Sequence, residues 1–342
     1  MSIIVTGSIA MDHLMTFPGR ITEQLVKDKL DAVSLSFLVD RLTVRRGGVG
    51  ANIAYGLGQL NLFPILVGAA GPDFGDYGRW LLQHGVDVES VRISDSHHTA
   101  RFSCTTDLDG NQIASFYPGA MREAGEIELA PVVRRVGGCE LVIVSPNEPA
   151  AMARHSEECR ARGYPFAADP SQQLALLAAD EIVSLLDGAH YLLTNEYERS
   201  LLLGKCGWSE RDVLERVEVW VTTLAADGAR VDRRGMEPIF VPAVPVKEPV
   251  DPTGAGDAFR AGFFAGVAWG FPLERAAQAG CLMAALAIES VGGQGYEFHL
   301  ETAVERVADT YGGAAATELQ RVAEAQAEVA LGKVPMMALV SP

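Results

Sequence analysis

The stretch that decides the fold is DPTGAGDAFRAGFFAG, residues 251–266. Gly254 and Gly256 are poor helix formers, each costing about 1 kcal/mol relative to alanine, but they suit a loop that another group approaches closely. The small and apolar residues after Asp257 predict a helix. The unpaired N–H groups and the dipole of such a helix start make an anion site. One acidic residue, Asp251, already stands just before this helix and could cap it. The second, Asp257, is therefore more than capping requires.

Composition limits the class of protein. The chain has 342 residues, 48% of them hydrophobic, which suits a large packed core. Its net charge of −16 disfavours nucleic acid as a partner, because a polyphosphate would be repelled. No apolar run approaches the ~20 residues of a membrane helix, and no secretory signal opens the chain. The five cysteines form no CxxC pair, so we expect reduced thiols, no structural zinc and a cytoplasmic location.

Apolar strand patterns alternate with amphipathic helix patterns along most of the chain. This order is typical of βαβ units and predicts an α/β fold with a central, mostly parallel sheet flanked by helices. We expect strands over 3–7, 64–68, 141–145, 165–168, 190–194 and 219–224. We expect helices over 51–60, 76–84, 150–162, 179–186, 195–203, 209–217, 254–269, 272–290, 300–311 and 315–331.

A second sheet is expected from segments with a period of two. They cover about 14–17, 37–44 and 100–117, the last being a hairpin around the turn Asp109-Gly110. Inserted between early βα units, these strands would form a small β-sheet lid over the core.

Three further stretches hold polar residues beside glycine turns or strand ends: RRGGVGANIA at 45–54 with Asn52, TNEYE at 194–198, and TGSIAMDH at 6–13 with Asp12. Taken singly, each also fits a structural role, such as a helix cap or an acid that complements the helix dipole. The chain lacks GxGxxG after its first strand, which argues against a dinucleotide-dependent dehydrogenase, and it has no P-loop.

Taken together, these motifs resemble the PfkB, or ribokinase-like, family of sugar and nucleoside kinases. The late signature, residues 251–257, is complete, whereas the early one departs at Asn61, where the family commonly has glycine or serine. The early signature fits at Gly47, Gly48, Gly50, Asn52, Ala54 and Gly71. Within the family, long segments such as SLSFLVD and ADPSQQL are most similar to actinobacterial adenosine kinases. The resemblance implies a kinase domain over 1–311, followed by a C-terminal helix and tail over 312–342.

The resemblance implies roles for the late loop. Gly254, Ala255 and Gly256, with the N–H of Asp257, would form the anion hole for the phosphoryl group in flight. Asp257 would be the base that takes the proton of the attacking hydroxyl. Phosphoryl transfer depends mainly on in-line positioning and charge stabilisation, which this arrangement can supply.

The resemblance also implies a nucleoside site. Asp12, Gly48 and Asn52 match positions that grip the sugar hydroxyls, with Ser8 and Ser36 as weaker additions. Phe102 and Phe116, on opposite arms of the lid hairpin, would sandwich a purine by offset stacking, although lid packing alone would also explain them. Gln172 and Gln173 would read the purine edge.

For the cofactors, ATP and Mg²⁺, the resemblance implies a second group of residues. Asn195 and Glu198 match a pair that organises Mg²⁺ and phosphate, with Glu198 acting through water. Thr223 to Gly228, with Gly256, would bind the nucleotide, but Ala225 stands where the family has glycine. Relatives of this kind often form dimers through their lids.

The expected function is therefore ATP-dependent phosphorylation of the adenosine 5′-hydroxyl to AMP, a step of purine salvage. Two alternatives stay open. One is a PfkB kinase for ribose, fructose or a different nucleoside, in which we would expect polar groups at the two phenylalanine positions. The other is a non-catalytic nucleoside-binding homologue, against which the intact GAGD loop counts.

Overall fold

A computed structural model describes residues 2–25 and 34–330. Its core is a nine-stranded sheet in the order β13-β12-β11-β10-β9-β8-β1-β4-β5. Neighbours from β11 to β5 run parallel, whereas β12 and β13 join antiparallel, so the expected α/β class is confirmed. The strands are β1 (Ile3–Thr6), β4 (Ile65–Ala70), β5 (Val91–Ile93), β8 (Leu141–Val144), β9 (Phe166–Ala168), β10 (Tyr191–Asn195), β11 (Val219–Thr223), β12 (Ala229–Arg233) and β13 (Ile239–Val241).

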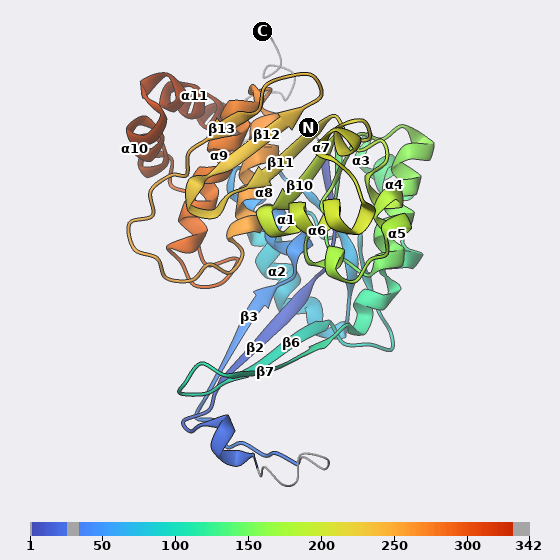
Figure 1. The fold of residues 1–342 in the computed structure, drawn as a ribbon, viewed down its shortest axis with the longest axis vertical. Helices are drawn as coiled ribbons and strands as arrows, with labels where there is room; N and C mark the ends of the chain where they lie inside the picture. Colours follow the sequence, from blue (N-terminus) through green and yellow to red (C-terminus); the bar gives the residue numbers. More distant parts are fainter. Residues whose placement is uncertain (1, 26–33, 331–342) are drawn as a thin grey trace.

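Helices cover both faces of this sheet (Figure 1). One apolar core is closed by α1 (Val49–Gln59), α2 (Gly75–Gln83), α8 (Ala255–Ala268), α9 (Leu273–Ile288), α10 (Leu300–Tyr311) and α11 (Gly313–Ala330). The other is closed mainly by α3 (Leu129–Val136), α4 (Pro149–Arg162), α5 (Ala179–Leu186), α6 (Glu196–Cys206) and α7 (Glu210–Leu214). Short 3-10 helices are η1 (Ile21–Gln24), η3 (Pro72–Phe74), η4 (Gly119–Glu126), η5 (Ser171–Ala175) and η6 (Ala225–Asp227).

The second sheet projects from the core as a separate arm, at the bottom of Figure 1. Its order is β3 (Arg41–Gly47), β2 (Ala10–Thr16), β6 (Ala100–Thr106), β7 (Gln112–Tyr117). We call this arm the lid. The strand expected over 37–44 lies at Arg41–Gly47, and the one expected over 14–17 begins already at Ala10.

Some elements differ from the expectation. Strands β5, β12 and β13 and helix α3 were not expected, and α7 is shorter than the pattern over 209–217. Residues 331–342 of the expected tail lie outside the described residues. None of the described helices is long and apolar enough to span a membrane.

The connectivity identifies the place of the site. From β1 the chain builds outward through β4 to β5, and it then returns to β8 and builds the opposite half of the sheet. In open parallel sheets, ligands bind beyond the carboxyl ends of the strands where the order reverses. Here that point lies beside β1 and β8, and the lid begins directly after β1.

Candidate active site

The first turn of α8 carries the GAGD loop. Gly254 precedes the helix with φ of 80°, in the left-handed region that favours glycine. A Cβ at this position would lie 2.4 Å from Cα of Gly293, so the close approach of two backbones also requires glycine here. The N–H groups of Gly256 and Asp257 lie in the first turn, where helices leave such groups unpaired, whereas the N–H of Ala255 donates to the carbonyl of Pro252 at 3.2 Å.

Asp257 is partly buried in this first turn. Oδ2 of Asp257 accepts a hydrogen bond from Nδ2 of Asn52 at 2.8 Å. Burial raises the pKa of Asp257 to about 6, against the opposing effects of the Arg260 charge and the Asn52 hydrogen bond. A carboxyl group with such a pKa is a stronger base than an ordinary aspartate and is still ionised at neutral pH.

Asn52 is itself held by a polar chain. Oδ1 of Asn52 accepts from Nε2 of Gln294 at 2.9 Å, and the same nitrogen lies 2.6 Å from the Tyr77 hydroxyl. Tyr77 in turn donates to the carbonyl of Gly47 at 2.8 Å. This series of hydrogen bonds therefore connects Asp257 with Gly47, where the lid strand β3 meets the core.

The lid places the predicted nucleoside residues in one row. Asp12 on β2 is directly opposite Arg45 on β3 and Phe102 on β6, and Phe102 is opposite Phe116 on β7. Directly paired residues project to the same face of a sheet. This lid face therefore offers a carboxylate, a guanidinium and two phenyl rings side by side, with Phe116 49% exposed.

Asp12 and Asp257 belong to the same site. Burial, followed by the charges of these two carboxylates, raises the pKa of Tyr77. Burial also raises the pKa of Asp12, while the charge of Arg45 opposes the shift. In the described part of the chain, the Asp12 carboxylate accepts no hydrogen bond, so its oxygens remain available to a ligand.

Arg45 also ties the lid to the GAGD loop. Its Nη1 lies 2.9 Å from Oδ2 of Asp251, which accepts a second hydrogen bond from the N–H of Gly292. Asp251 therefore serves the geometry of the loop.

The remaining predicted nucleoside residues are placed less directly. The Ser8 hydroxyl accepts from the N–H of Val49, and Gly48 is the N-cap of α1. Nε2 of Gln173 donates to the carbonyl of Asn147, and Gln172 is exposed on η5. Ser36 is exposed and precedes the distal end of β3, so it is not brought to this group of residues.

A cavity of about 850 Å³ lies on the other side of the GAGD turn. Ala255 and Gly256 are among the residues that line it, and its walls are mostly apolar. The predicted nucleotide residues Asn195, Thr223 and Gly228 line it. A cavity of this size, lined in part by the first residues of α8, has room for a nucleotide, and the helix N-terminus offers a place for its phosphates.

The turn after β11 borders this cavity. Gly228 has φ of 96°, and a Cβ there would lie 2.0 Å from the carbonyl oxygen of Val241, so only glycine fits. Ala225, at the position where the resemblance expects glycine, has φ of 50°. The backbone therefore keeps the left-handed conformation of a glycine although the residue is alanine.

Asn195 and Glu198 form a reciprocal cap at the start of α6. Oδ1 of Asn195 accepts from the N–H of Glu198, and Oε2 of Glu198 accepts from the N–H of Asn195, each at 2.8 Å. Oε1 of Glu198 also accepts from the Ser171 hydroxyl at 3.3 Å. Asn195 and Glu198 therefore cap the N-terminus of α6, which is the structural role that their spacing also fits.

These contacts limit how Mg²⁺ can be held. Among the described residues, no group of three or more histidine, cysteine, aspartate or glutamate side chains could hold a metal ion. Mg²⁺ commonly keeps several waters and is bound mainly by substrate phosphates. The buried and engaged Glu198 fits a contact through water better than direct ligation.

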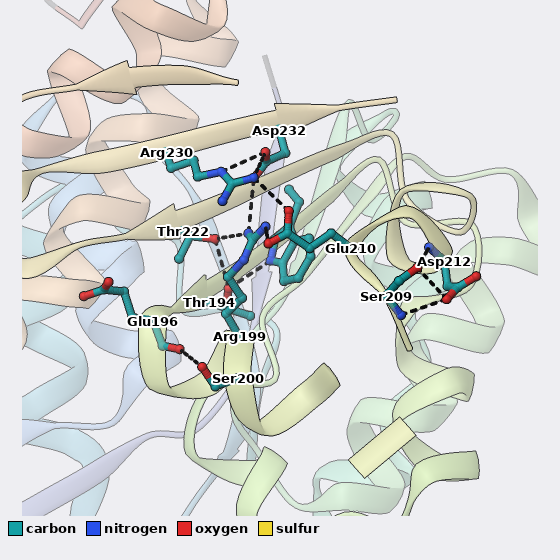
Figure 2. Close-up of polar contacts among 11 residues, drawn as sticks. Thr194, Glu196, Arg199, Ser200, Ser209, Glu210, Asp212, Thr222, Arg230 and Asp232 are labelled. Atoms are coloured by element: carbon teal, nitrogen blue, oxygen red, sulfur yellow. Dashed lines mark hydrogen bonds and ion pairs between the residues drawn. The ribbon is translucent and has the colours of Figure 1, made fainter. Parts of the chain in front are cut away.

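A buried ionic cluster fixes α6 to the sheet, as Figure 2 shows. The Arg199 guanidinium lies 3.6 Å from the ring centroid of Trp220, and its Nη1 donates to Thr222 at 2.8 Å and to Asp232 at 3.1 Å. Arg230 binds Asp232 from the other side. The cluster holds the start of α6, with Asn195, against β11 and β12 at the edge of the cavity.

Sequence reasoning missed five residues of this site, namely Arg45, Tyr77, Asp169, Arg260 and Gln294. A second glycine-rich stretch, GGQG at 292–295, was an available signal for Gln294. Asp169 and Arg260 form a buried ion pair between segments far apart in the chain, which local pattern does not reveal.

Comparison with known proteins places the chain among kinases. The family model described as "pfkB family carbohydrate kinase" matches residues 6–298. The chain is 28% identical over 295 residues to a nucleoside kinase of Methanothermobacter thermautotrophicus, covering 85% of this chain and 91% of that one.

Solved structures agree with this result. The nucleoside kinase of Burkholderia thailandensis in complex with inosine is 34% identical, with a TM-score of 0.77 over 91% of this chain and 98% of that one. The same kinase has been solved with ADP and inosine, at 35% identity and a TM-score of 0.75, covering 91% of this chain and 96% of that one.

Proposed function

This chain belongs to the pfkB family of carbohydrate kinases, and from that premise we propose that it is an adenosine kinase, which transfers the γ-phosphate of ATP to the adenosine 5′-hydroxyl. At the coarser level it is a kinase for a sugar or nucleoside hydroxyl. The observation that carries the finer proposal is the row of Asp12, Phe102 and Phe116 on one lid face. It joins a carboxylate for ribose to two rings for a base.

The support for a nucleoside comes from this row and from the relatives. Because the two rings lie side by side on one lid face, they suit stacking against one face of a purine rather than the sandwich expected from the sequence, and they offer nothing to the hydroxyls of a free sugar. The Burkholderia thailandensis relative binds inosine, which is also a purine nucleoside. A kinase that prefers inosine or another nucleoside is therefore the second candidate.

The residues divide the chemistry among them. ATP supplies the phosphoryl group, and a bound Mg²⁺ would offset the charge of its phosphates. The N–H groups of Gly256 and Asp257 stabilise the negative charge of the group in transfer, while the N–H of Ala255 holds the turn through the carbonyl of Pro252. Asp257 accepts the proton of the attacking hydroxyl, and Asn52, which keeps one Nδ2 proton beyond its bond to Asp257, assists Asp12 in holding the ribose.

We also propose that the chain forms a homodimer through its lids. The lid face opposite to Asp12 carries Leu42, Val44, Ile113 and Tyr117, each 45–57% exposed. An apolar face of this kind is stabilised when a second copy covers it. The charge and the unpaired cysteines suit the cytoplasm.

The test is ATP consumption by the purified protein with adenosine, inosine, guanosine, ribose and fructose. We expect the highest kcat/KM with adenosine. Phe102→Ala or Phe116→Ala should raise the KM for adenosine by about ten-fold or more, since stacking on an aromatic ring contributes about 1–3 kcal/mol.

Ser103→Ala and Ser115→Ala are matched controls, because these residues are paired on the same two strands but face the other side. Turnover of ribose or fructose above all nucleosides would replace the proposal with the sugar-kinase alternative. Adenosine binding without ATP consumption would indicate the non-catalytic homologue.

A further inference from the structure

A buried ion pair near the GAGD turn joins Arg260 to Asp169. Nε and Nη2 of Arg260 donate to the two oxygens of Asp169 at 2.5 and 2.6 Å. Asp169 is fully buried at the end of β9, and Arg260 is 5% exposed. A bidentate pair of this kind fixes the guanidinium plane as well as its position.

The same guanidinium reaches back to the phosphate turn. Nη1 of Arg260 donates to the carbonyl of Gly256 at 3.0 Å. Arg260 follows Asp257 by three residues on α8, so its side chain runs along the first turn. The loop that begins at Asp169 continues into η5, which carries Gln172 and Gln173, the residues predicted to read the purine. Arg260 therefore connects that loop with the GAGD turn.

Charge gives this residue a second effect. The groups that act electrostatically on Asp257 are Arg260, Asp169 and Glu198, and its hydrogen-bond partner is Asn52. Arg260 is the only cation among them in the described part of the chain. Burial acts to lower the pKa of Arg260, but the charge and hydrogen bonds of Asp169 outweigh it and raise the pKa, so Arg260 stays charged at every working pH.

We propose that Arg260 is a positioning residue for phosphoryl transfer. Its guanidinium locks the first turn of α8 onto the β9–η5 loop and presents a fixed buried positive charge to Asp257. This inference rests on the proposed kinase function, but not on adenosine as the acceptor.

Two substitutions break the same ion pair with opposite effects on Asp257. Arg260→Met removes the positive charge, so the pKa of Asp257 should rise by about one unit. Asp169→Asn removes a negative charge and leaves Arg260 unneutralised, so the pKa should fall. A purely structural pair would give the two variants the same pH dependence.

The first readout is the acid limb of log(kcat/KM) for the best acceptor of the wild type. We expect it to move to higher pH in Arg260→Met and to lower pH in Asp169→Asn. Arg260→Lys, which keeps the charge but cannot make the bidentate contact, should keep the limb near its wild-type position while kcat falls about ten-fold or more.

The second readout needs no turnover. The Tm difference between each variant and the same variant carrying Asp257→Asn should grow with pH and become constant above the pKa of Asp257 in the folded protein. The pH of that plateau should follow the same order, which keeps failure of the kinase proposal separate from failure of this one. The inference would be overturned if the acid limb and the plateau pH stay unmoved in Arg260→Met and Asp169→Asn, or if they move in the same direction in both. If Arg260→Met does not fold, the comparison of Arg260→Lys with Asp169→Asn decides.

Discussion

Nδ2 of Asn52 donates to Oδ2 of Asp257 at 2.8 Å, joining two residues that are 205 positions apart. One is near the start of the helix after the lid strand β3, and the other is in the GAGD turn. The contact joins the helix that follows the lid to the GAGD turn. It also gives Asn52 influence over the charge of the Asp257 carboxyl group, which we propose as the base.

A pH dependence follows from this contact. Because burial raises the pKa of Asp257 to about 6, kcat/KM should fall as the pH drops through about 6 and the base becomes protonated. The Asn52 hydrogen bond lowers that pKa, so Asn52→Ala should move the acid limb to higher pH. The measurement is log(kcat/KM) between pH 5 and 8.

A matched control is available on the same helix. Gln59 ends α1 and accepts from the N–H of Phe298, far from the GAGD turn. Gln59→Ala should leave the limb in place. An Asn52→Ala limb that coincides with the wild type would mean that the hydrogen bond does not act on the titrating group.

Much of the fold was predictable because its signals are local. Apolar runs such as Ile3–Thr6 and Leu141–Val144 lie where the strands were expected, and the late helices follow their amphipathic patterns. Strand β3 shows the limit. Its bounds are set by pairing from Thr16 with Arg41 to Ala10 with Gly47, and register across strands is a tertiary property that alternation in one strand leaves open.

The site was predictable only in part for the same reason. The GAGD loop and Asp12 carry recognisable patterns, whereas Gln294 acquires its meaning through bonds to Asn52 and Tyr77. Arg260 is a single charged residue in an otherwise apolar helix, and no sequence motif around it indicates its partner Asp169. The capping box at Asn195 and Glu198 shows that one motif can satisfy the helix and still border the cavity.

Asp257→Asn should abolish most turnover and stabilise the fold. Loss of a positioned base costs roughly 10²–10⁴ in rate. The pKa of this buried carboxyl lies at about 6, above the ordinary value near 4, so its carboxylate form destabilises the folded protein. The contribution of this one group to stability is thus greatest below pH 4, falls as the pH rises to about 6, and stays constant above.

Asp257→Asn removes that loss, so at pH 8 the variant should be more stable than the wild type by about 2–3 kcal/mol, and at pH 4 the two should agree. Urea denaturation at both pH values measures the difference. A folded variant that keeps a third of the wild-type kcat would show that another group is the base.

Ala225→Gly should stabilise the nucleotide turn. Ala225 has φ of 50°, and the left-handed conformation costs a residue with a Cβ about 1–2 kcal/mol that glycine avoids. Part of that gain is offset by the larger backbone entropy of glycine in the unfolded chain. We expect a net gain of about 0.5–1 kcal/mol in the free energy of unfolding, with the KM for ATP nearly unchanged.

Gly204, in the interior of α6, offers the reverse comparison, since a Cβ there meets no atom within 4 Å. Gly204→Ala should stabilise the protein through helix propensity alone. If Ala225→Gly destabilises the protein instead, the left-handed geometry of the turn is not what the chain adopts in solution.

The last prediction separates recognition of the sugar from recognition of the base. Asp12 projects from the lid beside Phe102, and no hydrogen bond among the described residues occupies its carboxylate. If Asp12 holds the ribose 2′- or 3′-hydroxyl, then 2′-deoxyadenosine should lose about 1–3 kcal/mol of transition-state binding in the wild type. In Asp12→Ala the discrimination between the two nucleosides should shrink, because the acceptor is gone. The comparison of kcat/KM for both nucleosides forms a double-mutant cycle, in which contacting groups are non-additive.

His13→Ala is the control, because His13 is the next residue and lies on the opposite lid face, so this variant should preserve the discrimination. Strictly additive losses in Asp12→Ala would instead assign Asp12 to the structure of the lid.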